Sequence, residues 1–434
     1  MSNQFIPLSQ LADILGGFAF KSQDLGDAGY SVVKIANIEP PNVNSHGSAR
    51  VLPKVVVGLD RFKLKAGDIL MAMTGATTGK VGRIRSSETL YLNQRVAKLS
   101  AKVGPEYDDF IYAIVSQPGF DQLVMNNAHG SAQPNVSADG IGRILIPHFH
   151  PDEQLAIGRC IGALDDKIES NRRTSRTLEK VVRAIFRAWF VDFEPVKAKG
   201  SGARSFLGMP QEVFDALPTR LVDSRLGPIP EDWEVGRLGE NCEINALSVK
   251  QGDINANIEY IDISSVTVGS LDSVRIVPYS DAPSRARRRV RHGDTIWSCV
   301  RPNHRSYLFI HTPPDHRIVS TGFAVLSPRS FGPSLLHQLT IQPEFVEYLV
   351  ANADGSAYPA VRPDHFEVAD VIVPPSSIRE AFEAITMPCR DHVAFSDREC
   401  EKLSALRDYL LPKLLNGEVR VTEAGDIVGE GLTR

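Results

Sequence analysis

The segment from Pro151 to Pro195 carries the pattern that most constrains how this chain can fold. Its inward-facing positions alternate in steps of four and three residues, at Ile157, Ile161, Leu164, Ile168, Asn171, Ser175, Leu178, Val182, Ile185 and Trp189. Such a stripe is typical of a helix that faces another helix. Pro151 suits a first helical turn, and Asp152 and Glu153 favour the positive end of the helix dipole. We therefore predict a helix about 60 Å long at about 1.5 Å per residue.

A second segment with the same rhythm begins near Ser377. Ser377 and Glu380 form a capping box. The stripe then runs through Ile378, Phe382, Ile385, Cys389, His392, Ser396, Glu399, Leu403, Leu406 and Leu410. Both stripes are apolar at their ends and polar near the middle, which indicates one antiparallel pair of helices with a fixed register. Two separate amphipathic helices, each covering its own domain, are the alternative. The paired interface is expected to use Ile157, Ile161, Leu164, Ile168, Leu178, Val182, Ile185, Trp189, Phe382, Ile385, Leu403, Leu406 and Leu410.

Composition narrows the class of protein. The chain has 434 residues, of which 42% are hydrophobic and 23% charged, so it is long enough for two or more globular domains. It has no apolar run near the roughly 18 residues that a membrane span needs, and its first residues lack the features of a secretory signal. Five scattered cysteines favour free thiols and a cytoplasmic location. The net charge of −4 neither favours nor excludes nucleic acid.

The chain contains two diverged copies of one unit. Five pairs of short motifs recur in the same order: Leu11–Asp13 with Leu238–Glu240, Lys34–Ile38 with Asp262–Val266, Gly67–Leu70 with Gly293–Ile296, Gly130–Val136 with Gly355–Val361, and Ile146–Pro147 with Val373–Pro374. Such ordered recurrence indicates duplication. β-branched runs at 32–35, 54–57 and 257–263 predict strands, and 109–116 and 344–351 predict short helices.

These observations predict an α+β chain built from two repeated domains and two long helices, related by an approximate two-fold axis within the chain. The expected boundaries are a first domain at 1–150, a first long helix at 151–195, a linker at 196–230, a second domain at 231–375, a second long helix at 376–416 and a tail at 417–434. In that arrangement the two domains present similar surfaces a fixed distance apart.

Motifs for catalysis and for metal binding are missing or incomplete. The loop Thr74–Val81 resembles a phosphate-binding loop, but only three residues separate Gly75 from Gly79, and Val81 follows Lys80 where that loop needs Ser or Thr. His148, His150, Cys389 and His392 do not complete a set of four zinc ligands. We therefore expect no catalytic residues, no metal and no cofactor in this chain.

Basic and amide side chains recur at corresponding places in the two copies. The DNA-binding candidates in the first copy are Lys80, Arg83, Asn93, Gln94, Arg95, Gln133 and Asn135. Those in the second copy are Arg285, Arg287, Arg288, Arg289, Arg301, Asn303 and Arg305. Arginine can contact phosphates or guanine, and Asn or Gln can contact adenine. The simpler interpretation is a solvated charged face, but the recurrence favours DNA, and the differing side chains suit two different target sequences.

The chain resembles the DNA-specificity subunits of type I restriction–modification systems along essentially its whole length. The resemblance rests on the helix endings Ala184–Val196 and Leu410–Arg420, on the motifs Gly67–Leu70, Thr74–Lys80 and Gly130–Val136, and on the Leu226–Trp233 entry to the second copy. The second copy departs from the pattern, because Arg301-Pro-Asn-His replaces the Gly-Lys loop and Tyr358-Pro-Ala replaces Gln133-Pro-Asn. Contacts therefore do not transfer residue by residue into that copy.

The resemblance implies two target-recognition domains, separated by the paired helices, that read a bipartite, asymmetric site in double-stranded DNA. It also implies methyltransferase (modification) subunits and a restriction/translocase subunit as partners. S-adenosylmethionine, ATP and magnesium would belong to those partners, and no membrane is involved. The bulky end Ile185–Phe193 is expected either to dock partner subunits or to pack within this chain. Two other functions stay open: a bivalent protein-binding adaptor without DNA specificity, and a methyltransferase with embedded specificity domains, which the missing cofactor loop disfavours.

Overall fold

The computed structural model describes residues 5–128, 135–250, 254, 256–355, 358–421 and 423–424. The chain divides into two compact units. The first unit comprises Met1–Asn171 with Arg398–Arg434, and the second unit comprises Arg172–Asp397. Each long helix contributes one half to each unit, so the packing of the helices is described separately for each unit.

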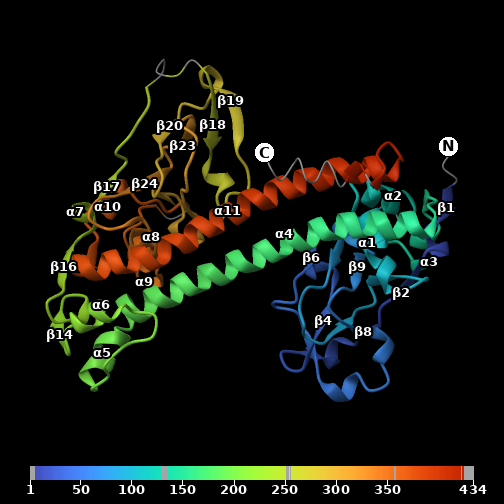
Figure 1. Ribbon diagram of the computed structural model, residues 1–434, viewed down its shortest axis with the longest axis horizontal. Coiled ribbons are helices and arrows are strands. Elements are labelled where there is room, and N and C mark those ends of the chain that lie inside the picture. Colours follow the sequence, from blue (N-terminus) through green and yellow to red (C-terminus); the bar gives the residue numbers. More distant parts are fainter. Residues whose placement is uncertain are drawn as a thin grey trace. The chain divides into compact units, whose positions relative to one another are not determined.

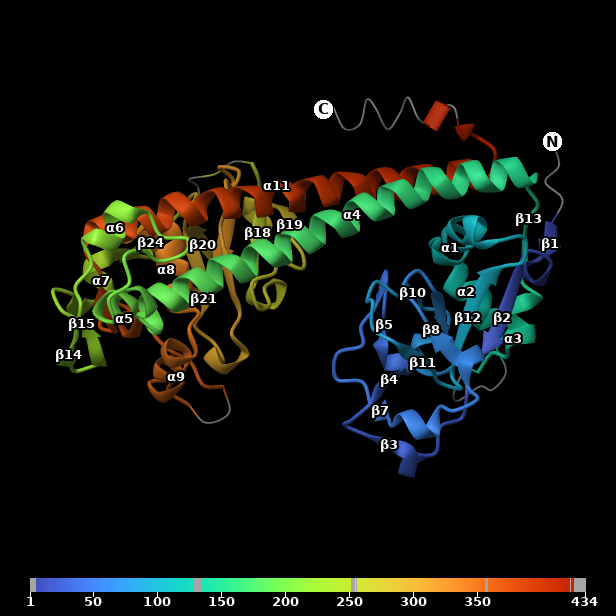
Figure 2. The same ribbon diagram turned by 60° about the horizontal axis from the view of Figure 1, so that its bottom comes forward.

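The first unit is built on two mixed sheets and three short helices (Figure 2). The larger sheet has the order β2 (Ala12–Gly16), β12 (Val96–Ala101), β9 (Ile69–Ala72), β10 (Val81–Arg83), β6 (Asn42–Val43) and β5 (Ile38–Glu39). The second sheet has the order β3 (Leu25–Gly26), β7 (Arg50–Val51), β4 (Tyr30–Val33), β11 (Leu90–Leu92) and β8 (Lys63–Leu64). β1 (Phe5–Pro7) pairs with β13 (Leu145–Pro147), and the helices are α1 (Asp108–Ser116), α2 (Phe120–Asn126) and α3 (Ala138–Gly142).

The second unit repeats this plan with fewer strands. One sheet has the order β17 (Cys242–Ile244), β24 (Phe323–Pro328), β21 (Thr295–Ser298) and β22 (Tyr307–Phe309). The other sheet has the order β19 (Arg275–Pro278), β18 (Asn257–Ile261), β23 (Arg317–Ser320) and β20 (Ala286–Arg289). β16 (Glu234–Arg237) pairs with β25 (Asp370–Val373). The helices are α7 (Leu238–Asn241), α8 (Pro333–Thr340), α9 (Pro343–Ala351) and α10 (Pro363–Glu367). Strands β2, β12, β9 and β10 of the first unit correspond in order to β17, β24, β21 and β22 of the second.

The duplication is visible in individual hydrogen bonds. In the first copy the carboxylate of Asp68 accepts from the backbone N–H of Lys65 at 2.9 Å, and in the second copy Asp294 accepts from that of Arg291 at 2.6 Å. The preceding glycine has a left-handed backbone in both copies, with φ of 92° at Gly67 and 88° at Gly293. The repeated Gly-Asp motif is therefore a turn that closes on its own side chain, and the predicted repeat is confirmed at this level of detail.

The two predicted long helices are present. Helix α4 spans Pro151–Phe186 and continues through a π-helical turn at Arg187–Val191, and α11 spans Ser376–Leu415 (Figure 1). In the first unit Ile157, Ile161, Leu164 and Ile168 of α4 share a hydrophobic core with Cys400, Leu403 and Leu410 of α11, and Leu406 is partly buried against it. In the second unit Val182 and Trp189 share a core with Phe382, and Ile185 and Ile385 are partly buried against it, while Leu178 is half-buried.

The direction of pairing follows from specific contacts within each unit. In the first unit Asp165 contacts Arg407 and the later residue Asn171 contacts the earlier residue Glu399, so the helices are antiparallel there. In the second unit Phe186 and Phe190 pack edge-to-face on Phe382, near the start of α11. The alternative of two helices that do not pair with each other is therefore wrong.

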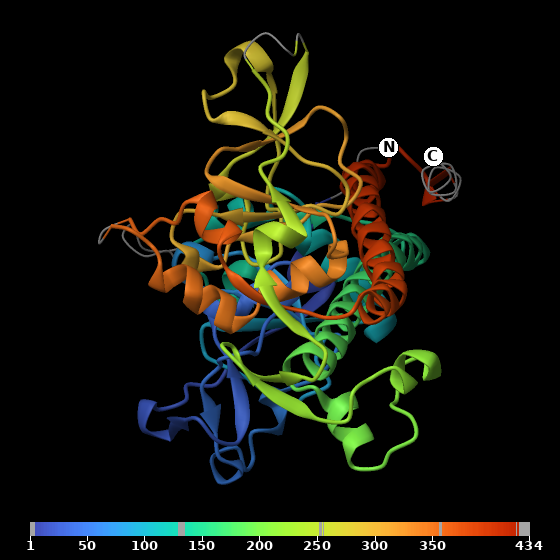
Figure 3. The same cartoon turned by 90° about the vertical axis from the view of Figure 1, so that its left-hand side faces the viewer.

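The segment expected to be a linker contains regular structure. It holds α5 (Glu194–Gly200), α6 (Gln211–Asp215) and the hairpin of β14 (Leu221–Ser224) and β15 (Gly227–Pro230), green to yellow-green in Figure 3. Val196, Met209, Phe214, Leu217 and Ile229 are buried in the core of the second unit. Because these apolar side chains anchor it, the segment is part of the packed unit rather than a loose connection.

The short elements agree with the sequence in part. The helices expected at 109–116 and 344–351 are α1 and α9. The run at 257–263 contains β18, and the run at 32–35 overlaps the end of β4. The strand expected at 54–57 is absent: a 3₁₀ turn at Pro53–Val55 begins with proline, and Val57 is 80% exposed. Proline favours the turn and an exposed β-branched residue gains nothing from a sheet, so local propensity was misleading here.

Candidate nucleic-acid interface

Polar side chains of the first unit gather where β9 ends. The turn between β11 and β12 exposes Gln94 and Arg95, while Asn93 is buried beneath them. The carbonyl oxygen of Arg95 accepts from the N–H of Met73 at 3.0 Å, and the N–H of Gln94 donates to Phe18 at 2.9 Å. These backbone bonds hold the turn beside the loop that follows β9.

The glycine-rich loop Thr74–Lys80 lies next to this turn. Thr74 forms an antiparallel bridge with Asn135, whose side chain is exposed, and the N–H of Val136 donates to Met73 at 3.0 Å. Gly79 has φ of 85°, and a Cβ there would lie 2.8 Å from Cα of Asp121, so only glycine fits. The exposed Lys80 follows. We call Lys80, Gln94, Arg95 and Asn135 the first tip. Gln133 lies outside the described residues.

Arg83 does not belong to this surface. It lies at the opposite end of the β9–β10 pair, where it is opposite Ile69. Its guanidinium is buried, with Nη1 2.6 Å from Oδ1 of Asp109 and the cation 4.5 Å from the centre of the Tyr112 ring. The candidate role of Arg83 in DNA contact is therefore wrong: this side chain binds α1 to the sheet.

The second unit has the same backbone hydrogen bonds at the corresponding strand end, but it presents different side chains there. The N–H of Cys299 donates to Gly322 at 2.8 Å, as that of Met73 does to Arg95, and the N–H of Val361 donates to Cys299 at 2.8 Å, as that of Val136 does to Met73. Thr321 and Gly322 thus occupy the places of Gln94 and Arg95. Arg285 lies beside this turn, because its carbonyl oxygen accepts from the N–H of Thr321 at 2.8 Å.

The second copy also presents Arg301 and Tyr358, which correspond in sequence to Gly75 and Gln133 of the first copy. Val300 forms an antiparallel bridge with Ala360, as Thr74 does with Asn135. Arg301 is half-buried, and the carbon at the centre of its guanidinium lies 4.7 Å from the centre of the Tyr358 ring. We call Arg285, Arg301, Thr321 and Tyr358 the second tip. Sequence reasoning aligned Tyr358 with Gln133 but did not include it among the DNA-binding candidates, and it missed the turn at Thr321.

The remaining arginines of the second unit differ in how far they are engaged. Arg288 donates to the carbonyl oxygen of Phe323 at 2.6 Å and to Asn245, and burial lowers its pKa. Arg305 donates to the carbonyl oxygen of Ile341 at 2.9 Å. Both side chains therefore bond to the fold, and their candidate role in DNA contact stays a prediction. Arg287 donates to Ser284 at 2.8 Å, whereas the side chains of Arg289 and Asn303 are exposed.

Arg285 is exposed but has an acidic neighbour. Its Nη2 lies 2.6 Å from Oδ2 of Asp262, and its side chain remains about half exposed. This ion pair holds the guanidinium at the edge of the second tip. A phosphate or base edge would therefore compete with Asp262 for the same donors.

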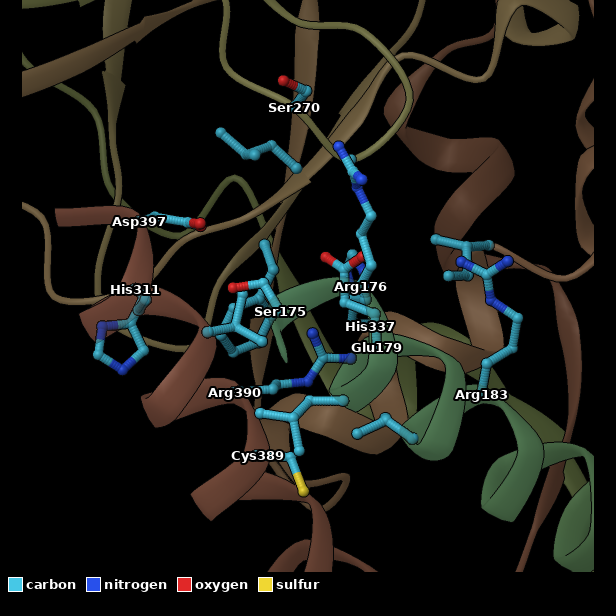
Figure 4. A pocket seen from close by; sticks show the side chains of 18 of the residues that line it. Ser175, Arg176, Glu179, Arg183, Ser270, His311, His337, Cys389, Arg390 and Asp397 are labelled. Carbon is cyan, nitrogen blue, oxygen red and sulfur yellow. The ribbon is translucent and has the colours of Figure 1, made fainter. Parts of the chain in front are cut away.

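A cavity of about 410 Å³ lies within the second unit, between the two long helices, β22 and α8 (Figure 4). Arg183 and Glu179 line it from α4 and Arg390 from α11, and burial raises the pKa of Glu179 and lowers that of Arg390 to about 10. His337 of α8 is buried, which holds its pKa well below the usual value, and its Nδ1 lies 3.2 Å from Oγ1 of Thr295. The side chains that line the cavity include both acids and bases. We interpret the cavity as a gap in the packing of the long helices against the domain.

The aromatic end of α4 is an internal contact. Phe186, Trp189, Phe190 and Phe193 are buried in the core of the second unit, together with Phe382. Of the two roles considered from sequence, packing within this chain is therefore correct for these side chains.

The described residues contain neither a metal site nor a membrane-spanning helix. No group of three or more His, Cys, Asp or Glu side chains in that part of the chain is placed to hold a metal ion. All five cysteines are free thiols. No helix in the same part of the chain is long and apolar enough to cross a membrane.

Part of the chain matches a known family model. Residues 2–180 match the model of the type I restriction modification DNA specificity domain. By this match, and by the relatives that follow, the chain is similar to the DNA-specificity subunits of type I restriction–modification systems. It is 24% identical over 392 residues to the type I restriction enzyme MjaIX specificity subunit of Methanocaldococcus jannaschii, covering 87% of this chain and 84% of that protein. It is also 24% identical to the HindI specificity subunit of Haemophilus influenzae, covering 66% and 71%.

The fold of this chain is shared with a solved structure. The crystal structure of the S subunit of a type I restriction–modification system from M. genitalium superposes with a TM-score of 0.58 at 14% identity, covering 95% of this chain and 96% of that chain. The α+β fold with two repeated domains and two long helices, predicted from sequence, is thereby confirmed. Its relatives are named as specificity subunits, which agrees with a role in recognition rather than catalysis.

Proposed function

We propose that this specificity subunit reads a bipartite, asymmetric sequence in double-stranded DNA, with one half-site contacted by each tip. The observation that carries the proposal is the pair of equivalent tips. One backbone framework, closed by Met73 and Val136 in the first copy and by Cys299 and Val361 in the second, presents different polar side chains. A shared framework with divergent contacts is what two unlike half-sites require.

The chemistry of the tips suits DNA. Lys80 and Arg95 are exposed cations that can neutralise phosphates, and Gln94 and Asn135 carry amides that can donate to and accept from an adenine edge. In the second tip the guanidinium groups of Arg285 and Arg301 can contact phosphates or guanine. The two half-sites are therefore expected to differ in sequence.

The paired helices are proposed to set the distance between the half-sites. One turn of DNA spans about 34–36 Å, and helices of roughly 50–60 Å that overlap in part can hold two readers about one turn apart. The target should therefore contain a gap of several base pairs that no side chain reads.

The proposed partners are methyltransferase subunits and a restriction/translocase subunit. They would supply the chemistry, with S-adenosylmethionine bound by the first, and ATP and magnesium bound by the second. Base modification would require the methyltransferase to turn the target base out of the duplex. This chain would contribute sequence recognition and an assembly surface. We propose a cytoplasmic location, where the DNA is.

A bivalent protein adaptor is disfavoured, because the relatives are named as restriction-enzyme specificity subunits. Salt separates the two functions. Binding through phosphate contacts weakens steeply as salt rises, whereas an apolar protein interface does not. Binding of the purified complex to DNA should be measured from about 50 to 200 mM salt.

The deciding experiment is to map DNA methylation in cells that express this chain with its methyltransferase partner. We expect one motif with two unlike halves and a constant gap. Expression of the methyltransferase subunit without this chain is the control, and it should leave no such motif. A single uninterrupted motif, or the same methylation without this chain, would contradict the proposal.

A further inference from the structure

Arg301 has a backbone conformation that its equivalent in the first copy leaves to glycine. Arg301 has φ of 51° and ψ of 63°, in the left-handed region. Gly75 follows Thr74 as Arg301 follows Val300, and it has φ of 77°. Glycine adopts this region without steric cost, whereas a residue with a Cβ does not. The second copy therefore has a strained arginine at a position where the left-handed backbone favours glycine.

The surrounding chain holds that arginine in place. Its N–H donates to the carbonyl oxygen of Pro359 at 2.7 Å, and the N–H of His304 donates back to the carbonyl oxygen of Arg301 at 2.9 Å. Both main-chain polar groups are thus satisfied, and the strain is held by the bridge between Val300 and Ala360. Strain of this kind persists where the surroundings over-determine the conformation, and it is concentrated at functional sites.

The guanidinium is held as firmly as the backbone. It lies over the ring of Tyr358 at 4.7 Å, and that ring is 70% exposed. A large exposed aromatic side chain gains little by packing in this way, so the contact does not serve the core. A contact with a ring face uses none of the N–H groups of the guanidinium, so its donors stay available to a ligand.

We infer that Arg301 is a specificity-determining residue that reads a guanine in one half-site, with Tyr358 as its positioning residue. This inference rests on the proposed function and names one contact within it. Two parallel N–H donors match the O6 and N7 acceptors of guanine in the major groove, and this is the commonest specific contact of arginine with DNA. A guanidinium already held in plane loses less freedom when it binds. The strain at Arg301 is then retained because glycine cannot make the contact.

The test compares the DNA motifs methylated by variant complexes in cells. Arg301→Gly restores the residue type that the backbone favours, so we expect the purified chain to unfold at an equal or higher temperature. We expect its preference for guanine at one position of one half-site to fall by roughly 5- to 150-fold. Arg301→Lys keeps the charge but not the paired donors, and it should relax the same position.

Two further variants test the tyrosine. Tyr358→Phe keeps the ring and should retain the wild-type motif, whereas Tyr358→Ala should relax the same guanine without changing the other half-site. Arg204→Gly, an exposed arginine outside both tips, is the matched control and should leave the motif unchanged.

Two results would overturn the inference. One is an Arg301→Gly complex that folds and methylates the wild-type motif with full discrimination at every position. The other is a Tyr358→Phe complex as relaxed as Tyr358→Ala, which would assign the effect to the hydroxyl group rather than to stacking. Failure of the proposed function is a different result, because the wild-type complex would then produce no bipartite motif at all.

Discussion

Arg83 donates from Nη1 to Oδ1 of Asp109 at 2.6 Å, and the pair joins the end of β10 to the first turn of α1. The arginine is almost entirely buried, while the aspartate side chain is 37% exposed. Arg83 was one of the DNA-binding candidates from sequence, but in the structure it forms an internal ion pair. The exposed Arg95, twelve residues later, is the better candidate for DNA contact.

Arg83→Met should destabilise the first unit without weakening DNA binding by the folded protein. The change leaves Asp109 without its cation, and we expect a loss of about 2 kcal/mol, below the 3–5 kcal/mol of a fully buried pair because the aspartate is partly hydrated. Urea unfolding measures the loss. Arg95→Ala is the matched variant: it should alter stability by less than about 0.5 kcal/mol and reduce the salt dependence of DNA binding by about one counterion. The reverse pattern would return Arg83 to the DNA surface.

The polar middle of the helix pair should determine register more than stability. In the first unit Nδ2 of Asn171 lies 2.5 Å from Oε2 of Glu399, and Lys167 lies 3.2 Å from the same oxygen. Glu399→Leu alone leaves the buried amide without its acceptor and should cost about 1–3 kcal/mol. Changing both Asn171 and Glu399 to leucine should recover that loss or exceed it, because buried polar groups in such seams cost stability.

Thermal unfolding and hydrogen exchange of the three variants test this prediction. Protection of the helix amides should become less uniform in the double variant, since Leu–Leu contacts tolerate shifted registers. A double variant that is less stable than Glu399→Leu would show that the network contributes net stability.

Shortening both helices by one heptad should change the gap of the DNA motif and leave both half-sites intact. Removing residues 172–178 and 392–398 shortens each helix by about 10 Å, which corresponds to about three base pairs at about 3.4 Å each. Methylation mapping reads the result. A control variant with the same heptads replaced by others of equal length should keep the original gap, and a shortened variant with an unchanged gap would refute the spacing role.

The second unit should lose stability below about pH 6.5 because of His337. Burial holds the pKa of this histidine well below its usual value, so the folded state stays neutral where the unfolded state gains a proton. The unfolded state then binds more protons, and stability falls as pH decreases, by about 1.4 kcal/mol per pH unit from this group. Unfolding between pH 5 and 7 measures the slope. His337→Gln should flatten it, and an equal slope in both proteins would assign the effect to other groups.

The sequence predicted the framework because periodicity reports burial directly. Ile157, Ile161 and Leu403 repeat at helical spacing, and all three are buried in the paired core. The Gly-Asp turns were recognisable for a similar reason: a glycine with positive φ and an acid that binds the main chain two residues before that glycine are local requirements. These features depend on few neighbours, so they survive in a single sequence.

The candidate site was harder to predict from sequence, because a charged residue in a sequence does not show which group it binds in the fold. Arg83, Arg288 and Arg95 are the same residue type in the sequence. In the structure Arg83 pairs with Asp109 and Arg288 donates to the carbonyl oxygen of Phe323, and these partners lie about 25 to 35 positions away in the chain. Tyr358 was noted in sequence only as a departure from the family pattern. Its role follows from the bridge that brings it to Arg301, and no pattern in the sequence predicts that bridge.

The Gly-Asp turns at Gly67 and Gly293 are closed by their own carboxylates and are bonded to neighbouring strands, as Asp68 is to Lys98 of β12 at 2.9 Å, rather than to the loops that carry the tips. A loop could therefore be exchanged without refolding the strands that carry it. An exchange of that loop between related chains would then alter the surface of one tip in a single event and leave the supporting strands unchanged.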